Sequence, residues 1–370
     1  MKKTVLVVGP WARTGGVHTF MRNLCIHSNL NETWNMKRFD LSRPPKKTMD
    51  NNQYNFLTSN PTRMIKSLGV TSRNFLRFPF HAKNSDVLQL QASDHYAFWE
   101  PMLYAQIAKI QGRPVVMRFG GSFDKFYESS TPTQQEAIKK ALQIPDRLVV
   151  LSHWWKDIFG QFVDPQKIHV IPNAVPTPPP MPKRESRTGK PIVLFICGSE
   201  AKRKGIDAML ELVKKLHHKT HFLFVAVTDQ LKTWITEQGL AEHIEMHGEQ
   251  TRKDMKDIFY PRADIFMLPS FGEGFPNSML EAMAAGLPTI TTPVGSIPEV
   301  LIPHEHGFIN DPTDVASFHR DLEYLVDHPK ERIQMGRNAY KMVCDEYNLN
   351  TVFATYNQLW NEAIAEFSRK

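Results

Sequence analysis

Residues 268–288 read LPSFGEGFPNSMLEAMAAGLP, and this stretch decides the fold class. The apolar run around its start, 263–270, predicts a buried strand, and the loop 271–276 that follows is rich in glycine. A short helix is expected from about Ser278 to Ala285, where glycine and proline end it. A strand that passes through such a loop into a helix is typical of the carboxyl edge of a parallel sheet, where open α/β folds bind ligands.

The stretch carries two carboxylates, Glu273 in the loop and Glu281 inside the helix, with seven residues between them. Carboxylates at such an edge can accept hydrogen bonds from sugar hydroxyls, and the free N–H groups of the helix start can hold an anion. Glu281 has a second interpretation, because Ser278-x-x-Glu281 also matches a capping box. The pattern alone leaves both roles open.

Strands and helices alternate along the whole chain, which predicts doubly wound parallel sheets of the α/β class. At 370 residues the chain exceeds one typical core, so two domains are expected. Five prolines in residues 176–182 mark the junction between them. We therefore predict a first domain over 1–177, a linker over 178–188 and a second domain over 189–349, with a last helix, about 350–370, that packs back on the first domain.

The cysteines and the apolar runs indicate a cytoplasmic protein. Cys25, Cys197 and Cys344 are scattered without metal-ligand spacing, so neither a disulfide nor a zinc site is expected. No apolar run reaches the roughly 18 residues of a membrane span, and the N-terminal MKKTVLVVG reads as a first strand rather than a signal peptide. The loop after it ends in Gly15-Gly16 and matches neither the dinucleotide nor the Walker pattern, which argues against NAD and ATP.

The positive charge lies in the first half of the chain. Residues 1–180 hold 23 Lys and Arg against 12 Asp and Glu, whereas the net charge of the whole chain is only +7. Between Lys37 and Lys83, basic and apolar residues are interleaved. This stretch either forms a solvated basic face whose apolar side packs on the sheet, or lies on an anionic bilayer surface. No nucleic-acid motif is present, so no nucleic-acid partner is expected.

Several motifs follow one another in the second half: Gly198…Lys204-Gly205, ADIFMLPS, EGFPNS, EAMAAGLP and Gly295-x-x-x-Glu299. In this order the chain resembles the retaining nucleotide-sugar glycosyltransferases of family 4, also called glycosyl transferases group 1, and the two glutamates match their E-x7-E motif. The resemblance implies a GT-B fold, in which two Rossmann-like domains face each other across a cleft.

The resemblance also implies an activity. A sugar would pass from a nucleotide-diphosphate sugar, UDP-sugar first and GDP-sugar second, to a glycan or lipid-linked acceptor in surface polysaccharide or glycoconjugate biosynthesis. No metal or other cofactor is expected. The basic first domain would make a peripheral contact with an anionic membrane from the cytoplasmic side.

By the same resemblance, Glu281 would bind the ribose, Glu273 would lie beside the donor sugar, and Lys204 would pair with the diphosphate. Glu273 and Lys204 are thus the expected catalytic residues. The expected donor-binding residues are Gly16, Gly198, Ser199, Arg203, Lys204, Gly274, Phe275, Pro276, Asn277, Ser278 and Glu281. The candidates for the acceptor side are His95, Arg118 and Asp124. Front-face attack, with the leaving phosphate taking the acceptor's proton, is the expected mechanism, and Glu273 as a covalent nucleophile is its rival.

Two residues depart from the family pattern. Ser199 stands where the family usually has arginine, so either Lys202 or Arg203 supplies the second cation or phosphate binding is weaker. Phe119 stands where the family commonly has histidine, whose role would pass to one of the three acceptor-side candidates. These departures keep open the alternative of a catalytically weak nucleotide-sugar-binding protein. A UDP-sugar epimerase or a phosphorylase on the same scaffold stays open for another reason, because fold alone does not fix function.

Overall fold

The computed structural model describes residues 2–11, 16–27, 30–42, 61–121, 123–176, 178, 180–181, 189–198 and 200–368, without the side chains of 27, 31 and 61–68. Within it the chain divides into two compact units. Unit 1 comprises Met1–Ala174 and Leu349–Lys370, and unit 2 comprises Val175–Asn348. Most of the expected linker 178–188 lies outside the described residues, and so do Gly15 and Ser199.

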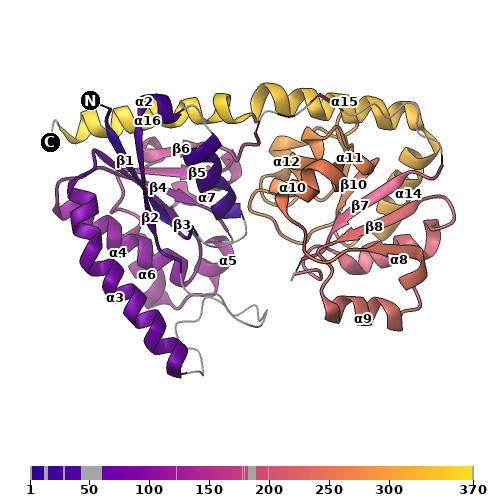
Figure 1. Cartoon of the computed structure of the whole chain (residues 1–370), viewed down its shortest axis with the longest axis horizontal. Coiled ribbons are helices and arrows are strands. Elements are labelled where there is room, and N and C mark those ends of the chain that lie inside the picture. Colours follow the sequence, from indigo (N-terminus) through magenta and orange to yellow (C-terminus); the bar gives the residue numbers. More distant parts are fainter. Residues whose placement is uncertain are drawn as a thin grey trace. The chain divides into compact units, whose positions relative to one another are not determined.

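Unit 1 is built on a six-stranded parallel sheet with the order β2-β1-β3-β4-β5-β6 (Figure 1). The strands are β1 (Thr4–Gly9), β2 (Asn35–Asp40), β3 (Val87–Ala92), β4 (Val115–Phe119), β5 (Arg147–Val150) and β6 (Ile168–Val170). All six residues of β3 are buried, as expected for a central parallel strand that is covered on both faces. The α/β prediction is therefore confirmed for this half.

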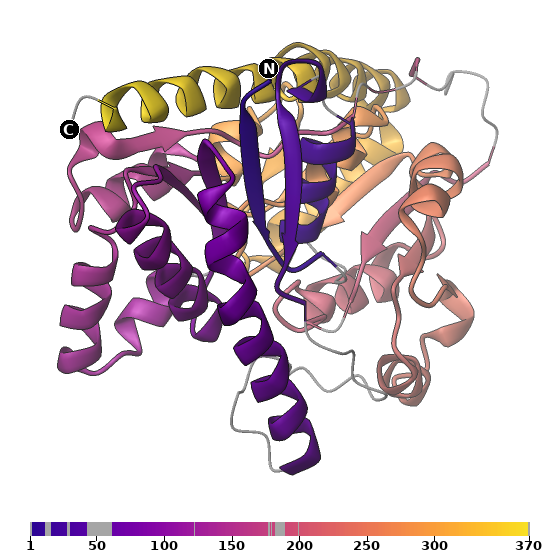
Figure 2. The same ribbon diagram turned by 60° about the vertical axis from the view of Figure 1, so that its left-hand side comes forward.

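Helices cover both faces of this sheet. They are α1 (Gly16–Arg22), the π-helical turn η1 (Asn23–His27), α2 (Leu30–Thr33), α3 (Pro61–Lys83), α4 (Tyr96–Ile110), α5 (Phe123–Glu128), α6 (Pro132–Ala141), α7 (His153–Gly160), the 3-10 turn η2 (Pro165–Lys167) and α16 (Leu349–Phe367). Figures 1 and 2 show that the first turns of α3 extend past the ends of the strands.

The last helix, α16, belongs to the core of unit 1. Trp360 is fully buried there, and its indole N–H donates to Oε1 of Gln89 at 3.0 Å. Its ring also meets that of Trp34 edge to face, with the centroids 5.4 Å apart. Because a buried indole N–H needs an acceptor, this bond sets the position of α16 on the sheet.

Unit 2 contains a second six-stranded parallel sheet, with the order β12-β11-β10-β7-β8-β9. Its strands are β7 (Ile192–Ile196), β8 (His221–Val225), β9 (Ile244–Met246), β10 (Ile265–Leu268), β11 (Thr289–Thr291) and β12 (Gly307–Ile309). Its helices are α8 (Ile206–Leu216), α9 (Asp229–Glu237), η3 (Ala241–His243), α10 (Arg252–Asp254), the π-helical η4 (Met255–Phe259), α11 (Tyr260–Arg262), α12 (Asn277–Ala284), α13 (Ile297–Val300), α14 (Val315–Asp327) and α15 (Pro329–Glu346).

The strand order of unit 2 reverses between β7 and β10. From β7 the chain proceeds outward through β8 and β9, and from β10 it proceeds the other way through β11 and β12. The loops that follow β7 and β10 therefore leave the sheet in opposite directions and open a crevice between them, which is where such sheets bind ligands.

Among the described residues, no helix has the length and apolar character needed to cross a bilayer.

Candidate functional site

The reversal point of unit 2 brings the predicted catalytic residues together. Lys204 lies in the loop after β7, and Glu273 lies in the loop after β10. Gly205 allows the two loops to touch, because a Cβ at this position, whose φ is +83°, would lie 2.1 Å from the carbonyl oxygen of Pro269. The backbone N–H of Phe271 also donates to the carbonyl of Arg203 at 2.8 Å.

The loop 270–276 is held from its other side by the segment that follows β11. The hydroxyl of Thr292 donates to the carbonyl of Ser270 at 2.7 Å, and that of Ser296 donates to the carbonyl of Gly274 at 2.6 Å. Gly295 approaches so closely that a Cβ there would lie 1.7 Å from the carbonyl oxygen of Glu273. These contacts pre-organise the loop, as a ligand site requires.

One oxygen of the Glu273 carboxylate is fixed by its neighbours. Ser270 Oγ donates to Oε1 at 2.9 Å, and Arg203 Nη1 lies 3.4 Å from the same oxygen. Arg203 also donates to the carbonyl of Gly272 and to Glu200. The Glu273 side chain is only 14% exposed, and its Oε2 accepts no hydrogen bond from a described residue. The carboxylate thus presents one oxygen that is free for a ligand.

Lys204 is a second cation close enough to feel the charge of this carboxylate. Burial lowers the pKa of Lys204, and the charge of Glu273 partly offsets that effect. Its ammonium forms no ion pair or hydrogen bond with a described residue, whereas Lys202 pairs with Asp207 at 2.6 Å. A half-buried ammonium beside a carboxylate is suited to receive an anionic group of a ligand.

Glu281 does not cap its helix. α12 begins at Asn277, one residue earlier than expected, and no side chain caps its N-terminus. Glu281 is therefore the fifth residue of the helix, too far along it to reach the first N–H groups. Its two oxygens instead accept hydrogen bonds from Arg252 Nη2 at 2.8 Å and from the Tyr260 hydroxyl at 3.0 Å. Of the two roles that the sequence left open for Glu281, the structure therefore excludes the capping box.

Arg252 and Tyr260 lie in none of the motifs that point to the site. The Tyr260 ring is buried, and burial together with the charge of Glu281 raises the pKa of its hydroxyl well above the usual value. The hydroxyl therefore stays protonated and donates to Glu281. Tyr260 follows directly on the π-helical turn η4, a feature that often accompanies functional sites. An Arg or Tyr so distant in sequence from a glutamate leaves no local pattern that would reveal the contact.

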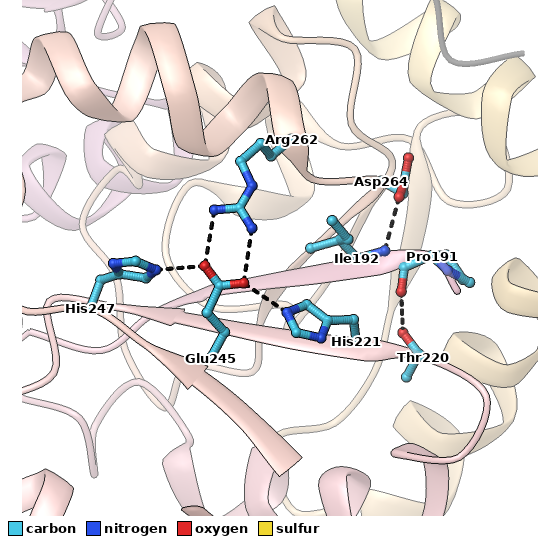
Figure 3. A network of polar contacts seen from close by, with 8 residues as sticks. All are labelled: Pro191, Ile192, Thr220, His221, Glu245, His247, Arg262 and Asp264. Atoms are coloured by element: carbon cyan, nitrogen blue, oxygen red, sulfur yellow. Dashed lines mark hydrogen bonds and ion pairs between the residues drawn. The ribbon is translucent and has the colours of Figure 1, made fainter. Parts of the chain in front are cut away.

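A polar network anchors α11, the helix that carries Tyr260 (Figure 3). Arg262 binds both oxygens of Glu245 at 2.9 and 2.8 Å, and His247 and His221 lie 2.6 and 2.8 Å from them. Arg262 above all, and then the two imidazoles, lower the pKa of Glu245 to about 2. This network ties α11 to β9 and so supports Tyr260, one of the two side chains that hold Glu281.

The start of α12 offers backbone donors beside the two glutamates. The N–H groups of Asn277 and Ser278 have no acceptor among the described residues, while those of Met279 and Leu280 both bond to the carbonyl of Pro276. The side chains of Phe275 and Pro276 are buried, so these two residues can offer only backbone groups to a ligand. Unpaired N–H groups at a helix N-terminus favour an anion.

The acceptor-side candidates of unit 1 differ in exposure. Arg118 is only 2% exposed, bonds to Gln91 and Asn173, and stacks over Phe20, and burial lowers its pKa. Arg118 thus bonds to other buried groups, and its side chain exposes too little surface for the predicted contact with an acceptor. His95 is exposed and strained, with a φ of +47°, and Asp124 is half-buried in α5. Strain of this kind is often retained at functional sites.

Phe119 belongs to an aromatic cluster at the end of β4. Its ring lies 4.6 Å from that of Phe159, 6.0 Å from that of Phe123 and 6.2 Å from that of Phe98. An apolar ring fits these neighbours, whereas an imidazole would need polar partners. Gly16 is the first residue of α1, beside a loop, 12–15, that lies outside the described residues.

Comparison with known families identifies the chain. Residues 41–178 match the family described as Glycosyltransferase Family 4, and residues 180–342 match the family described as Glycosyl transferases group 1. The chain belongs to these glycosyltransferases. The family resemblance expected from the motifs is therefore confirmed.

Curated relatives of this glycosyltransferase align over part of their length. An MMP alpha-(1->4)-mannosyltransferase from Mycolicibacterium hassiacum is 28% identical over 232 residues, which are 61% of this chain and 56% of that protein. The capsular polysaccharide biosynthesis glycosyltransferase CapM from Staphylococcus aureus is 25% identical over 185 residues, 48% of each chain. The chain spans about half the length of the curated relatives it matches.

Solved structures resemble this glycosyltransferase along the whole chain. A sucrose-phosphate synthase from Thermosynechococcus elongatus has a TM-score of 0.78 at 18% identity and covers 99% of this chain and 100% of its own. Anabaena HepE, solved in complex with UDP, has a TM-score of 0.72 at 13% identity, with 98% and 100% covered. With the two six-stranded parallel sheets, these likenesses confirm the predicted α/β fold of GT-B type.

Proposed function

We propose that this glycosyltransferase moves a sugar from a nucleotide-diphosphate sugar to a glycan or lipid-linked saccharide. The observation that carries the proposal is the convergence at one sheet edge of Glu273, Lys204, Glu281 and the open N-terminus of α12. The family membership and the names of the curated relatives, which include a mannosyltransferase and a capsular polysaccharide enzyme, support it.

Each part of the donor would meet a different group. The ribose hydroxyls would bind Glu281, whose orientation Arg252 and Tyr260 maintain. The diphosphate would bind Lys204 and the N–H groups of Asn277 and Ser278, which offset the charge of the leaving group without a metal ion. We propose UDP as the first candidate nucleotide, because HepE was solved with UDP and with UDP-glucose, and GDP as the second.

The proposed transfer retains the configuration of the sugar. The bond from the anomeric carbon to the phosphate oxygen breaks, the acceptor oxygen forms its bond on the same face, and the acceptor's proton passes to the leaving phosphate. The free Oε2 of Glu273 would stabilise the positive charge on the sugar, since Ser270 and Arg203 hold Oε1. Covalent attack by Glu273 is the rival mechanism, and it needs the same free oxygen.

The acceptor would bind at the carboxyl edge of the first sheet, where His95 and Asp124 lie. A lipid-linked or surface polysaccharide acceptor is supported by relatives named for capsule assembly and for a diphospho-undecaprenol substrate. Such an acceptor would bring the protein to the cytoplasmic face of a membrane. In this proposal residues 178–188 act as the linker between an acceptor domain and a donor domain.

The test is a calorimetric titration of the whole protein with UDP, GDP, ADP and their sugars. We expect UDP or GDP to bind, and Glu281→Gln to weaken that binding by about tenfold or more, since it removes a charged acceptor. Glu237→Gln on the exposed surface of α9 is the matched control and should bind like the natural protein. If none of the nucleotides or sugars binds, the proposal fails.

A second assay separates the alternatives. With UDP-sugar and no acceptor, an epimerase would convert the sugar, whereas a transferase would leave it intact or release it slowly to water. With a panel of saccharide acceptors, a catalytically weak binding protein would bind the donor and form no product.

A further inference from the structure

Apolar side chains gather on two neighbouring helices of unit 1. Of the twelve large apolar or aromatic side chains that are substantially exposed among the described residues, six lie on α3 and α4. They include the three most exposed, Ile110 at 77%, Phe80 at 73% and Leu76 at 70%; the others are Phe75, Trp99 and Leu103. Single exposed apolar residues are ordinary, but a gathering of this kind marks an interaction surface.

The inner faces of both helices are buried on the same side of the sheet. The Phe78 ring of α3 lies 5.3 Å from Phe39 of β2 and 4.5 Å from Tyr104 of α4. α4 in turn contacts β3 and β4. The outer faces of the two helices therefore point away from the sheet on one side of unit 1, and Figures 1 and 2 show α3 on the outside of the unit.

The outer residues form stripes along each helix. Leu76 and Phe80 are one turn apart on α3, and Trp99 and Leu103 are one turn apart on α4, with Ile110 on the same side two turns further on. We call this surface the α3–α4 face.

Positive charge surrounds the α3–α4 face. Arg73, Arg77 and Lys83 lie within four residues of Leu76 or Phe80, and α3 contains no Asp or Glu. Arg113 donates to the carbonyl of Lys83 at 2.7 Å and adds a cation where the two helices end. Burial, followed by the charges of Arg77 and Lys37, lowers the pKa of His81. On α4 the single acidic residue is Glu100.

We infer that the α3–α4 face docks on a bilayer surface that contains anionic phospholipid. Leu76, Phe80 and Trp99 would enter the boundary between headgroups and acyl chains, while the surrounding cations bind lipid phosphates. A second copy of the chain fits this face poorly, because a twofold contact would bring like charges together. The inference is independent of the proposed sugar transfer.

The experiment is co-flotation of the whole protein with vesicles of phosphatidylcholine alone or with about one-third phosphatidylglycerol. The protein should float with the anionic vesicles, much less with the neutral ones, and less again in high salt. Leu76→Glu/Phe80→Glu should lower binding to the anionic vesicles at least tenfold. Arg73→Gln/Arg77→Gln should lower it severalfold and remove most of the salt dependence.

The matched control is Ile258→Glu/Ile302→Glu, which adds the same charge at two exposed apolar positions of unit 2, 46% and 52% exposed. It should bind vesicles like the natural protein, and circular dichroism should show that every variant is folded. Equal binding by the Leu76→Glu/Phe80→Glu variant, or no binding by the natural protein, would overturn the inference. A third outcome would also overturn it: the natural protein does not bind vesicles but sediments as a dimer, and Leu76→Glu/Phe80→Glu dissociates that dimer. Loss of UDP or GDP binding would not bear on it, because nucleotide binding is a separate measurement.

Discussion

Arg203 positions the carboxylate of Glu273, which we propose as a catalytic group. Its guanidinium contacts Glu200, Glu273 and the carbonyl of Gly272, so its donors are already engaged within the protein. We therefore expect Arg203→Gln to lower kcat by about 10- to 100-fold through misplacement of Glu273. The dissociation constant of the nucleoside diphosphate should change by less than about threefold, because Arg203 contacts protein groups and its loss removes no contact with the phosphates. Steady-state kinetics and calorimetry measure the two quantities separately.

Lys202→Gln provides the comparison for this prediction. Lys202 pairs with Asp207 and lies 4.2 Å from the ring of Trp234, and Glu273 is not among its partners. Both kcat and nucleotide affinity should remain close to those of the natural protein. If Arg203→Gln weakens nucleotide binding tenfold and leaves kcat unchanged, Arg203 binds phosphate in place of the arginine that Ser199 replaces.

Some residues of the candidate site lie in sequence motifs, and others are joined to it only by contacts between distant positions. Glu273, Glu281 and Lys204 were predicted because each lies in a motif of contiguous residues. Tyr260 and Arg252 were missed because their contacts with Glu281 join positions 21 and 29 residues apart. Pairing between polar groups distant in sequence has no periodicity. The sequence could not decide whether Glu281 caps its helix, because that depends on the first residue of the helix. The structure starts α12 at Asn277, which places Glu281 out of reach of the first N–H groups.

At the level of elements, Gly295 decides whether the loop after β10 keeps its place. A Cβ there would lie 1.7 Å from a backbone oxygen that cannot move away without displacing Glu273. Gly295→Ala should lower the free energy of unfolding by about 2–4 kcal/mol. Gly239→Ala measures the cost of the positive φ alone. Gly239 has a similar φ of +70°, and a Cβ added there would have nothing within 4 Å. It should cost only about 1 kcal/mol. Urea unfolding measures both, and equal effects would contradict the steric argument.

The network around Glu245 should make the free energy of unfolding depend on pH, because it ties α11 to β9. The pKa of Glu245 is lowered from 4.5 to about 2, so its contribution is complete above pH 4.5 and is lost as the pH falls toward 2. Because the side chain is 28% exposed, we discount that contribution to about 1–2 kcal/mol. Glu245→Gln should therefore destabilise the protein at pH 7 and make little difference near pH 2.5. Urea unfolding at several pH values tests this, with Glu242→Gln, at 81% exposure, as the control. A difference that is independent of pH would exclude the ionic origin.

At the level of the whole molecule, most strands of the two parallel sheets were predictable because they are short apolar runs between turn residues. Such runs as residues 4–8 and 192–196 are local in sequence, and burial on both faces makes them apolar throughout. The edge strand β2 was missed, because its sequence NMKRFD is mostly polar and only Phe39 is buried. The order of the strands was not predictable in the same way. It depends on which edges pair, as when β10 joins β7 rather than β9, and that choice is set by contacts far apart in the chain.

Each unit has a hydrophobic core of its own, so damage to one should leave the other intact. Trp360→Ala removes a fully buried ring and its bond to Gln89, which should cost unit 1 about 3–5 kcal/mol. Hydrogen exchange followed by mass spectrometry should show faster exchange in β1, β3 and β4, and unchanged exchange in β7, β8 and β10. Trp234→Ala on α9 is the reciprocal variant, since Trp234 packs on the core of unit 2. Loss of protection in both units from either change would mean that the two cores unfold together.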